Sequence, residues 1–136
     1  SFMNISRSTT SKDLARAVVE GVSYAFADCI KVFENANLKP KTLIAAGGGS
    51  QSDRWLEIIS TVINTPIEIP NNSEHSAALG AARLGMLAFE NENDTKTILV
   101  KPKIKKTINP KTEKFEEYQD KINHWRKLYT RIKDKK

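Results

Sequence analysis

Three consecutive glycines followed by a serine, Gly47-Gly48-Gly49-Ser50, are the residues of this sequence best suited to contact a ligand. Because glycine has no Cβ atom, such a run lets the backbone approach a flat or charged molecule and adopt positive φ angles without strain. A helix is predicted to follow, and its unpaired N–H groups favour phosphate or the polar edge of a nucleotide. The run lacks both the Gly-Lys-[Ser/Thr] ending of a P-loop and a G-x-G-x-x-G spacing. Neither of those phosphate-binding motifs applies.

A structural interpretation accounts for the same residues. Ser50 and Asp53 have the spacing of a capping box, in which a serine and an acid three positions later satisfy free amides at a helix start. Taken alone, the local pattern favours this interpretation over a ligand site by roughly two to one, because such boxes are common. The surrounding sequence has to decide between them.

Other candidates for chemistry are isolated in the sequence. His75 and His124 stand alone, and structural roles are expected for both rather than metal binding or acid–base catalysis. The single Cys29 excludes an internal disulfide, and its place on an apolar helix face predicts a buried small side chain. The sequence therefore predicts no metal site and no redox chemistry, and its cysteine usage fits a reducing, cytoplasmic setting.

The glycines are expected to lie in a strand–loop–helix unit. Residues 42–46 are apolar and bounded by a proline and the glycines, which predicts a short buried strand. The helix is predicted from Ser52, with Trp55 anchoring it to the core rather than stacking on a base. An amphipathic helix over residues 12–35 precedes the unit, because apolar side chains recur there at steps of three and four.

The second half of the chain continues the alternation of strand and helix. Residues 66–70 predict a very short strand at a sheet edge, because a proline stands at each end. A helix is predicted from Asn72 or Ser73 to about Phe89, with a stripe of small residues that permits close backbone approach. The whole pattern predicts an α/β fold in which residues 1–90 form the core, 91–112 a connector and 113–136 a docking helix.

The formal net charge of +6 is unevenly distributed along the chain. Residues 1–90 carry a net charge of −1 and residues 91–136 a net charge of +7. The basic residues are therefore confined to the tail, where aromatic residues recur at helical spacing, as in a docking stripe. We expect no nucleic-acid partner. There is also no apolar run near the eighteen or so residues that cross a bilayer, so no membrane partner is expected.

Three segments together resemble the FGGY family of carbohydrate kinases. Asp13-Leu-Ala-Arg-Ala-Val-Val-Glu20 is similar to the family's second signature, although Asn4 replaces a glycine of that signature's first half. Gly47-Gly-Gly-Ser-Gln-Ser-Asp-Arg-Trp55 resembles its adenosine motif in the form found in the xylulokinase branch, and Ala77-Ala-Leu-Gly-Ala-Ala-Arg-Leu-Gly85 is similar to its Gly-Ala-Ala-Leu-Gly-Ala-Ala helix. The helical tail from Phe115 to Lys133 resembles the same branch more loosely.

The resemblance implies part of the C-terminal domain of a two-domain, actin-like kinase with a ribonuclease H-like core, which binds ATP and Mg²⁺ between its domains. By position, Gly48, Gly49 and Ser50 would line the adenine and ribose, and Asp53 would contact adenine. Gly47 and Ser52 would be supporting positions. The family's phosphate loops and catalytic aspartate have no counterpart in this sequence, so the resemblance implies no catalytic residue here and an inactive isolated chain.

The resemblance favours phosphorylation of D-xylulose to xylulose 5-phosphate in the cytoplasm. Sugar contacts would come from an N-terminal domain, and a homodimer is possible. Two alternatives stay open. One is another kinase of the family, acting on glycerol, gluconate, ribulose or rhamnulose. The other is a non-catalytic adaptor that retains an actin-like half-domain and contacts an acidic partner through its basic tail helix.

Overall fold

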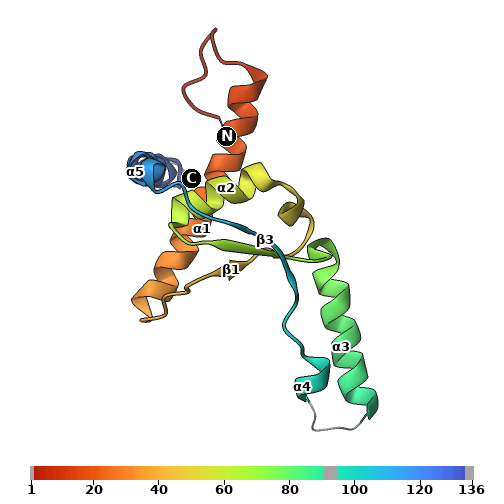
Figure 1. The fold of residues 1–136 in the computed structure, drawn as a ribbon. Helices are drawn as coiled ribbons and strands as arrows, with labels where there is room; N and C mark the ends of the chain where they lie inside the picture. The colour runs from red at the N-terminus through yellow and green to blue at the C-terminus, as the bar shows by residue number, and fades with distance from the viewer. Residues whose placement is uncertain (1, 91–94, 134–136) are drawn as a thin grey trace.

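A small mixed sheet lies at the centre of the molecule. The computed structural model describes residues 2–90 and 95–133. Its strands are β1 (Leu43–Ile44), β2 (Ile67–Pro70) and β3 (Ile104–Ile108), in the order β1-β2-β3. β1 runs parallel to β2 and β3 antiparallel to it. The α/β class predicted from the sequence is confirmed, with a sheet that is small relative to the helices (Figure 1).

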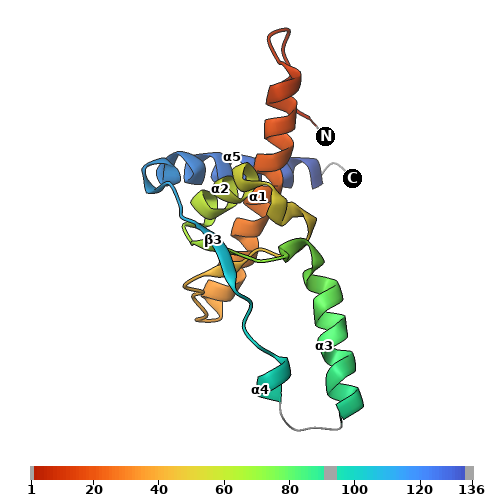
Figure 2. The same cartoon turned by 45° about the vertical axis from the view of Figure 1, so that its right-hand side comes forward.

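Three helices pack together beside this sheet. α2 (Asp53–Ile63) contacts α1 (Ser11–Asn35), α5 (Phe115–Lys133) and β3. Figure 2 shows α5 lying across α1, with α2 next to both. All three helices agree with the apolar periodicity of the sequence. α1 starts at a capping box, in which Thr10 and Asp13 each accept from the other's backbone amide.

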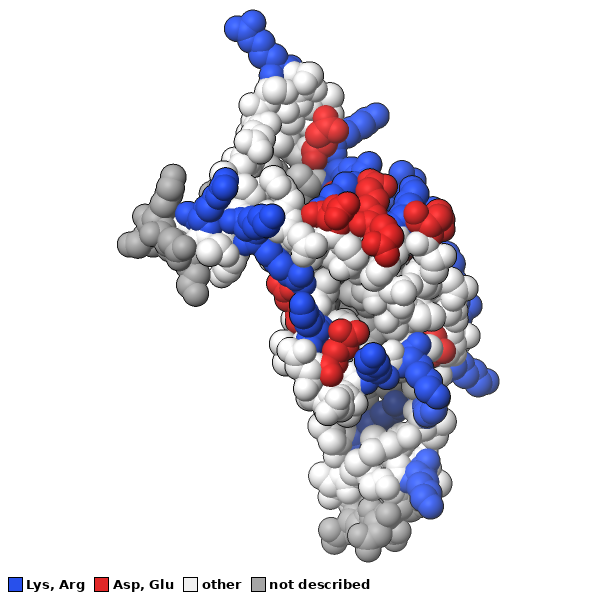
Figure 3. Space-filling view, turned by 90° about the vertical axis from the view of Figure 1, so that its left-hand side faces the viewer, with Lys and Arg blue, Asp and Glu red and all other residues white. Residues whose placement is uncertain are grey.

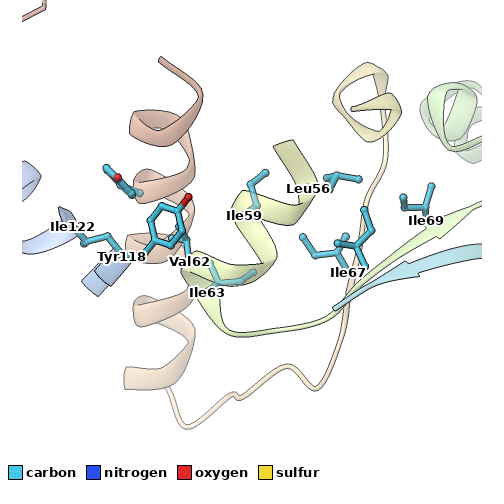
Figure 4. Close-up of a cluster of buried hydrophobic side chains, with 10 residues drawn as sticks. Leu56, Ile59, Val62, Ile63, Ile67, Ile69, Tyr118 and Ile122 are labelled. Carbon is cyan, nitrogen blue, oxygen red and sulfur yellow. The ribbon is translucent and has the colours of Figure 1, made fainter. Parts of the chain in front are cut away.

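The hydrophobic core lies between α2, α5, α1 and the inner face of β2 (Figure 4). Val62 and Ile122 have exposed fractions of 1% and 0%, so α2 and α5 meet at fully buried side chains. The other buried members of this cluster are Tyr24, Leu56, Ile59, Ile63, Ile67, Ile69, Ile108 and Tyr118. Tyr24 packs edge-on against Tyr118 and Trp125, so α5 contacts α1 through aromatic side chains.

α3 (Ser76–Glu90) projects away from the sheet, and the short α4 (Thr95–Ile98) lies beside its far end (Figures 1 and 2). The stripe of small residues was predicted to permit close backbone approach. In the structure a Cβ atom added at Gly80 or Gly85 would meet nothing within 4 Å. The predicted helix is therefore present, but its small-residue stripe has no packing partner among the described residues.

The sheet differs from the sequence prediction in its strands. β1 is shorter than residues 42–46 and Ile44 is exposed, because nothing in the described chain pairs with its outer edge. β2 was predicted at an edge but is the central strand, since β3 pairs with its other side. β3 lies in the expected connector and was missed. Cys29, predicted to be buried, is exposed.

Charged side chains of both signs are interspersed on the face shown in Figure 3. Ion pairs also join different elements of the fold, such as Arg126 of α5 with Asp28 of α1 at 2.5 Å and Lys111 with Glu57 at 2.7 Å. The basic tail is thus partly neutralised where it docks. Within residues 2–90 and 95–133, no helix is both long enough and apolar enough to cross a membrane.

Candidate functional site

The glycine run folds into a single tight turn. Gly47 has a φ of +86°, in the region that favours glycine, and η1 (Gly48–Gln51) follows as one turn of 3-10 helix. The Ser50 amide donates to the Gly47 carbonyl at 3.0 Å, which closes the turn. Gly48 and Gly49 are exposed, so their backbone is accessible from solvent.

Ser50 does not cap the following helix. The N-cap is Ser52, whose side chain accepts from the Trp55 amide at 3.4 Å, and α2 starts at Asp53. The capping box expected from the spacing of Ser50 and Asp53 is therefore wrong. The reason is that the Ser50 hydroxyl is buried and turns back, donating to the Gly47 carbonyl at 2.7 Å.

A second turn holds the glycine turn in place. Ser73 begins η2 (Ser73–His75), and its hydroxyl lies 2.5 Å from the Ser50 hydroxyl. Its carbonyl accepts from the Gly47 amide at 2.8 Å and from the Ser76 hydroxyl at 2.7 Å. Ser73 is 2% exposed. From the sequence, Ser73 was expected only at the start of a helix, because nothing local shows which distant residue its hydroxyl meets.

Replacing Ser73 by alanine is expected to loosen the glycine turn. The change removes the hydroxyl that meets Ser50 and should cost about 1 kcal/mol of unfolding free energy, the usual net value of one such bond. Urea unfolding measures the cost, and amide hydrogen exchange should accelerate at residues 47–50 more than in α2. Ser8→Ala, at an exposed position, is the matched control. Equal acceleration throughout the chain would contradict a local role.

Trp55 anchors α2, as the sequence predicted. Its indole Nε1 donates to the Ser23 hydroxyl of α1 at 3.2 Å. Its ring also limits what can stand at Gly49, where an added Cβ would lie 3.0 Å from the ring atom Cζ3. The indole thus lies at the contact between α1, α2 and the glycine turn, and it leaves little room for a side chain at Gly49.

A pocket of about 680 Å³ lies beside the two turns. It is located at the carboxyl ends of the parallel strands β1 and β2, where open α/β sheets bind their ligands. Of the six residues predicted to bind nucleotide, Ser50 and Asp53 line it, whereas Gly47, Gly48, Gly49 and Ser52 belong to the adjoining turn. The remaining lining residues are Gln51, Ile69, Pro70, Asn71, Asn72, Ser73, Glu74, Lys105 and Lys106.

Two lysines of β3 complete the pocket, and the sequence analysis missed both. The Lys106 ammonium lies 2.6 Å from the Asp53 carboxylate. Lys105 lines the same wall. The six predicted residues come from one sequence motif, whereas these lysines reach the site only through the pairing of β3 with β2. In the part of the chain that the structure describes, no group of three or more His, Cys, Asp or Glu side chains could hold a metal ion.

Comparison with known families decides what kind of domain carries this site. The C-terminal domain of the FGGY family of carbohydrate kinases matches residues 1–89, which include α1, the glycine turn and α3 except for its last residue. The chain belongs to the FGGY family of carbohydrate kinases. The resemblance stated from the sequence motifs is thereby confirmed.

Individual FGGY kinases resemble nearly the whole of this chain. The xylulose kinase of Escherichia coli K12 is 28% identical over 96% of the chain, and the autoinducer-2 kinase of E. coli SMS-3-5 is 33% identical over 95%. The crystal structure of the xyloylose kinase of Brucella ovis superposes on the entire chain with a TM-score of 0.85 and 33% identity. The chain spans only 27%, 25% and 28% of these proteins, respectively.

Proposed function

We propose that this chain is the nucleotide-binding portion of an ATP-dependent sugar kinase with an actin-like, ribonuclease H-like fold. The observation that carries the proposal is the glycine turn beside a polar pocket at the carboxyl ends of two parallel strands. The turn exposes backbone at Gly48 and Gly49, and α2 starts immediately after it. Both features suit a nucleotide.

The six predicted residues take separate roles in this proposal. Gly48, Gly49 and Ser50 lie along the adenine and ribose, and Asp53 contacts the base. Gly47 and Ser52 support the turn, Gly47 through its positive φ and Ser52 by capping α2. The buried contact between Ser50 and Ser73 supports the proposal, because it holds the exposed glycines of the turn in a fixed position.

We propose D-xylulose as the sugar, converted to xylulose 5-phosphate. Several relatives of this chain are xylulose kinases, including the E. coli and Staphylococcus xylosus enzymes. The autoinducer-2 kinase, at higher identity, favours a second candidate in which the acceptor is autoinducer-2 rather than a sugar. The acceptor would be held by a part of the kinase other than this site, within a cytoplasmic enzyme.

In this proposal the chain supplies binding and orientation rather than proton transfer. Mg²⁺ would offset charge on the transferring phosphoryl group, but the described residues offer no cluster of carboxylates to hold it. A carboxylate elsewhere in the kinase would take the proton from the sugar hydroxyl. The isolated chain is accordingly proposed to bind nucleotide weakly and not to phosphorylate sugar.

Titration of the ¹⁵N-labelled chain with ATP tests the site. We expect amide shifts at residues 47–53 and 71–73, with a dissociation constant on the order of 1 mM because only one side of a cleft is present. Gly49→Ala should weaken binding, since its Cβ would press on Trp55. Gly85→Ala, where a Cβ meets nothing, is the matched control. Unchanged shifts at residues 47–53 with about 10 mM ATP, some ten times that expected constant, would reject the site.

A further inference from the structure

A bulge in β3 places two neighbouring lysines on the same pocket wall. Ile69 pairs with Lys106 and Pro70 with Ile104, so Lys105 is an extra residue without a partner across the ladder. Pro70 has no N–H to donate, which is the chemical reason that the regular ladder is interrupted there. Side chains at successive strand positions normally point to opposite faces. Here Lys105 and Lys106 both line the pocket.

Lys106, which stays in the regular register beside the bulge, reaches Asp53, the first residue of α2. Their ion pair at 2.6 Å is half-exposed, and such pairs contribute little to stability. The pocket wall contains Asp53 and Glu74 as acids and Lys105 and Lys106 as bases. These charges cancel. The pocket therefore suits the uncharged, polar end of a nucleotide rather than its phosphates.

We propose that Lys106 and Asp53 together recognise the Watson–Crick edge of adenine, with Lys106 as a specificity-determining residue. This inference rests on the proposed nucleotide function. The Asp53 carboxylate accepts a hydrogen bond from the 6-amino group, and the Lys106 ammonium donates one to N1. Hypoxanthine presents the opposite pattern, an acceptor at position 6 and a donor at N1. A site arranged for adenine leaves two mismatched groups when it meets hypoxanthine.

Lys106 also positions Asp53. Without the ammonium, the carboxylate on an exposed first turn of α2 is free to rotate toward water, and the donor to N1 is lost. The strand register fixes Lys106, because its backbone pairs with Ile69 in the core-facing strand. Selectivity for the base would thus depend on a residue outside the family's matched segment of residues 1–89.

Parallel titrations of the chain with ATP and inosine triphosphate test the inference. We expect the unmodified chain to bind ATP about tenfold more tightly, the value of one to two hydrogen bonds. Lys106→Met should lower the ratio of the two dissociation constants to less than about threefold, mainly because it weakens the binding of ATP. Lys103→Met removes the same charge from the segment just before β3 without touching the pocket and should keep the full ratio. Unchanged amide chemical shifts of Val62 and Ile122, which lie in the core, show that each variant is folded.

The outcomes separate this inference from the function on which it rests. If neither nucleotide moves the amides of residues 47–53, the proposed function itself fails. If ATP binds but the unmodified chain shows no preference over inosine triphosphate, the inference is overturned while the nucleotide site stands. The same conclusion follows if Lys106→Met keeps the tenfold ratio. Loss of the ratio in Lys106→Met alone supports the assignment of Lys106.

Discussion

Replacing Ile122 by alanine is expected to lower the unfolding free energy by about 3 to 4 kcal/mol, within the range for a buried isoleucine. Ile122 is completely buried and lies where α5 meets α2 and α1, in the same core cluster as Val62 and Tyr118. The cavity left behind cannot collapse easily, because α2 is also held by the sheet. For a domain of this size, the loss is a large part of its total stability.

Thermal or urea unfolding followed by circular dichroism measures this effect. Ile132→Ala makes the same chemical change on the same helix, at a side chain that is 40% exposed, and should cost less than about 1 kcal/mol. A second readout is the near-ultraviolet signal of Trp125, which packs on Tyr24 only while α5 is docked. Equal losses for the two variants would show that α5 does not dock through Ile122.

Stability is expected to fall steeply above about pH 10, because two core tyrosines must remain protonated. Burial is the main reason that the pKa of Tyr24 and the pKa of Tyr118 are raised in the folded chain. The negative charge of Glu20, whose carboxylate accepts from the Tyr24 hydroxyl at 3.1 Å, adds to both shifts. An ionised Tyr24 would place its negative charge beside the Glu20 carboxylate.

Stability falls rather than rises with pH because the folded chain keeps its tyrosine protons to higher pH than the unfolded chain. Above about pH 10 the unfolded chain loses tyrosine protons that the folded chain retains, so unfolding becomes more favourable as pH rises toward the folded pKa values. Each tyrosine contributes up to about 1.4 kcal/mol per pH unit, and the two together contribute up to about twice that. Urea unfolding at a series of pH values gives the slope. Tyr24→Phe should remove about half of the slope of unfolding free energy against pH that the two tyrosines cause. An unchanged slope in this variant would contradict the prediction.

The sequence was sufficient to predict α1, α2 and α5, because each carries a continuous apolar stripe at helical spacing. It was not sufficient for β3. Four of the five residues in Ile104–Ile108 are exposed, and the strand exists because its backbone pairs with β2. Its lysines and flanking prolines are typical of a connector. For the same reason, β2 was predicted at an edge when β3 makes it central.

The residues of the candidate site likewise fall into those that local sequence predicts and those that depend on contacts distant in the sequence. The glycine turn could be located from its residue types, because three glycines between a strand and a helix are typical of a backbone that turns sharply or approaches a ligand. The residues that complete the site, Ser73 and Lys106, could not be located from the sequence. Ser73 meets Ser50 across 23 positions of sequence, and Lys106 meets Asp53 across 53. Contacts at such separations depend on how the strands align, which no local pattern records.

The backbone hydrogen bond from the Asn71 amide to the Lys103 carbonyl, at 2.9 Å, has a consequence for local unfolding of the chain. It joins the two ends of the segment that carries α3 and α4, directly at the end of the sheet. α3 buries none of its described side chains, so it can unfold locally while the β2–β3 ladder stays intact. The pocket and the buried contact between Ser50 and Ser73 lie at the sheet end of the segment, before α3 begins, so both should persist when α3 unfolds.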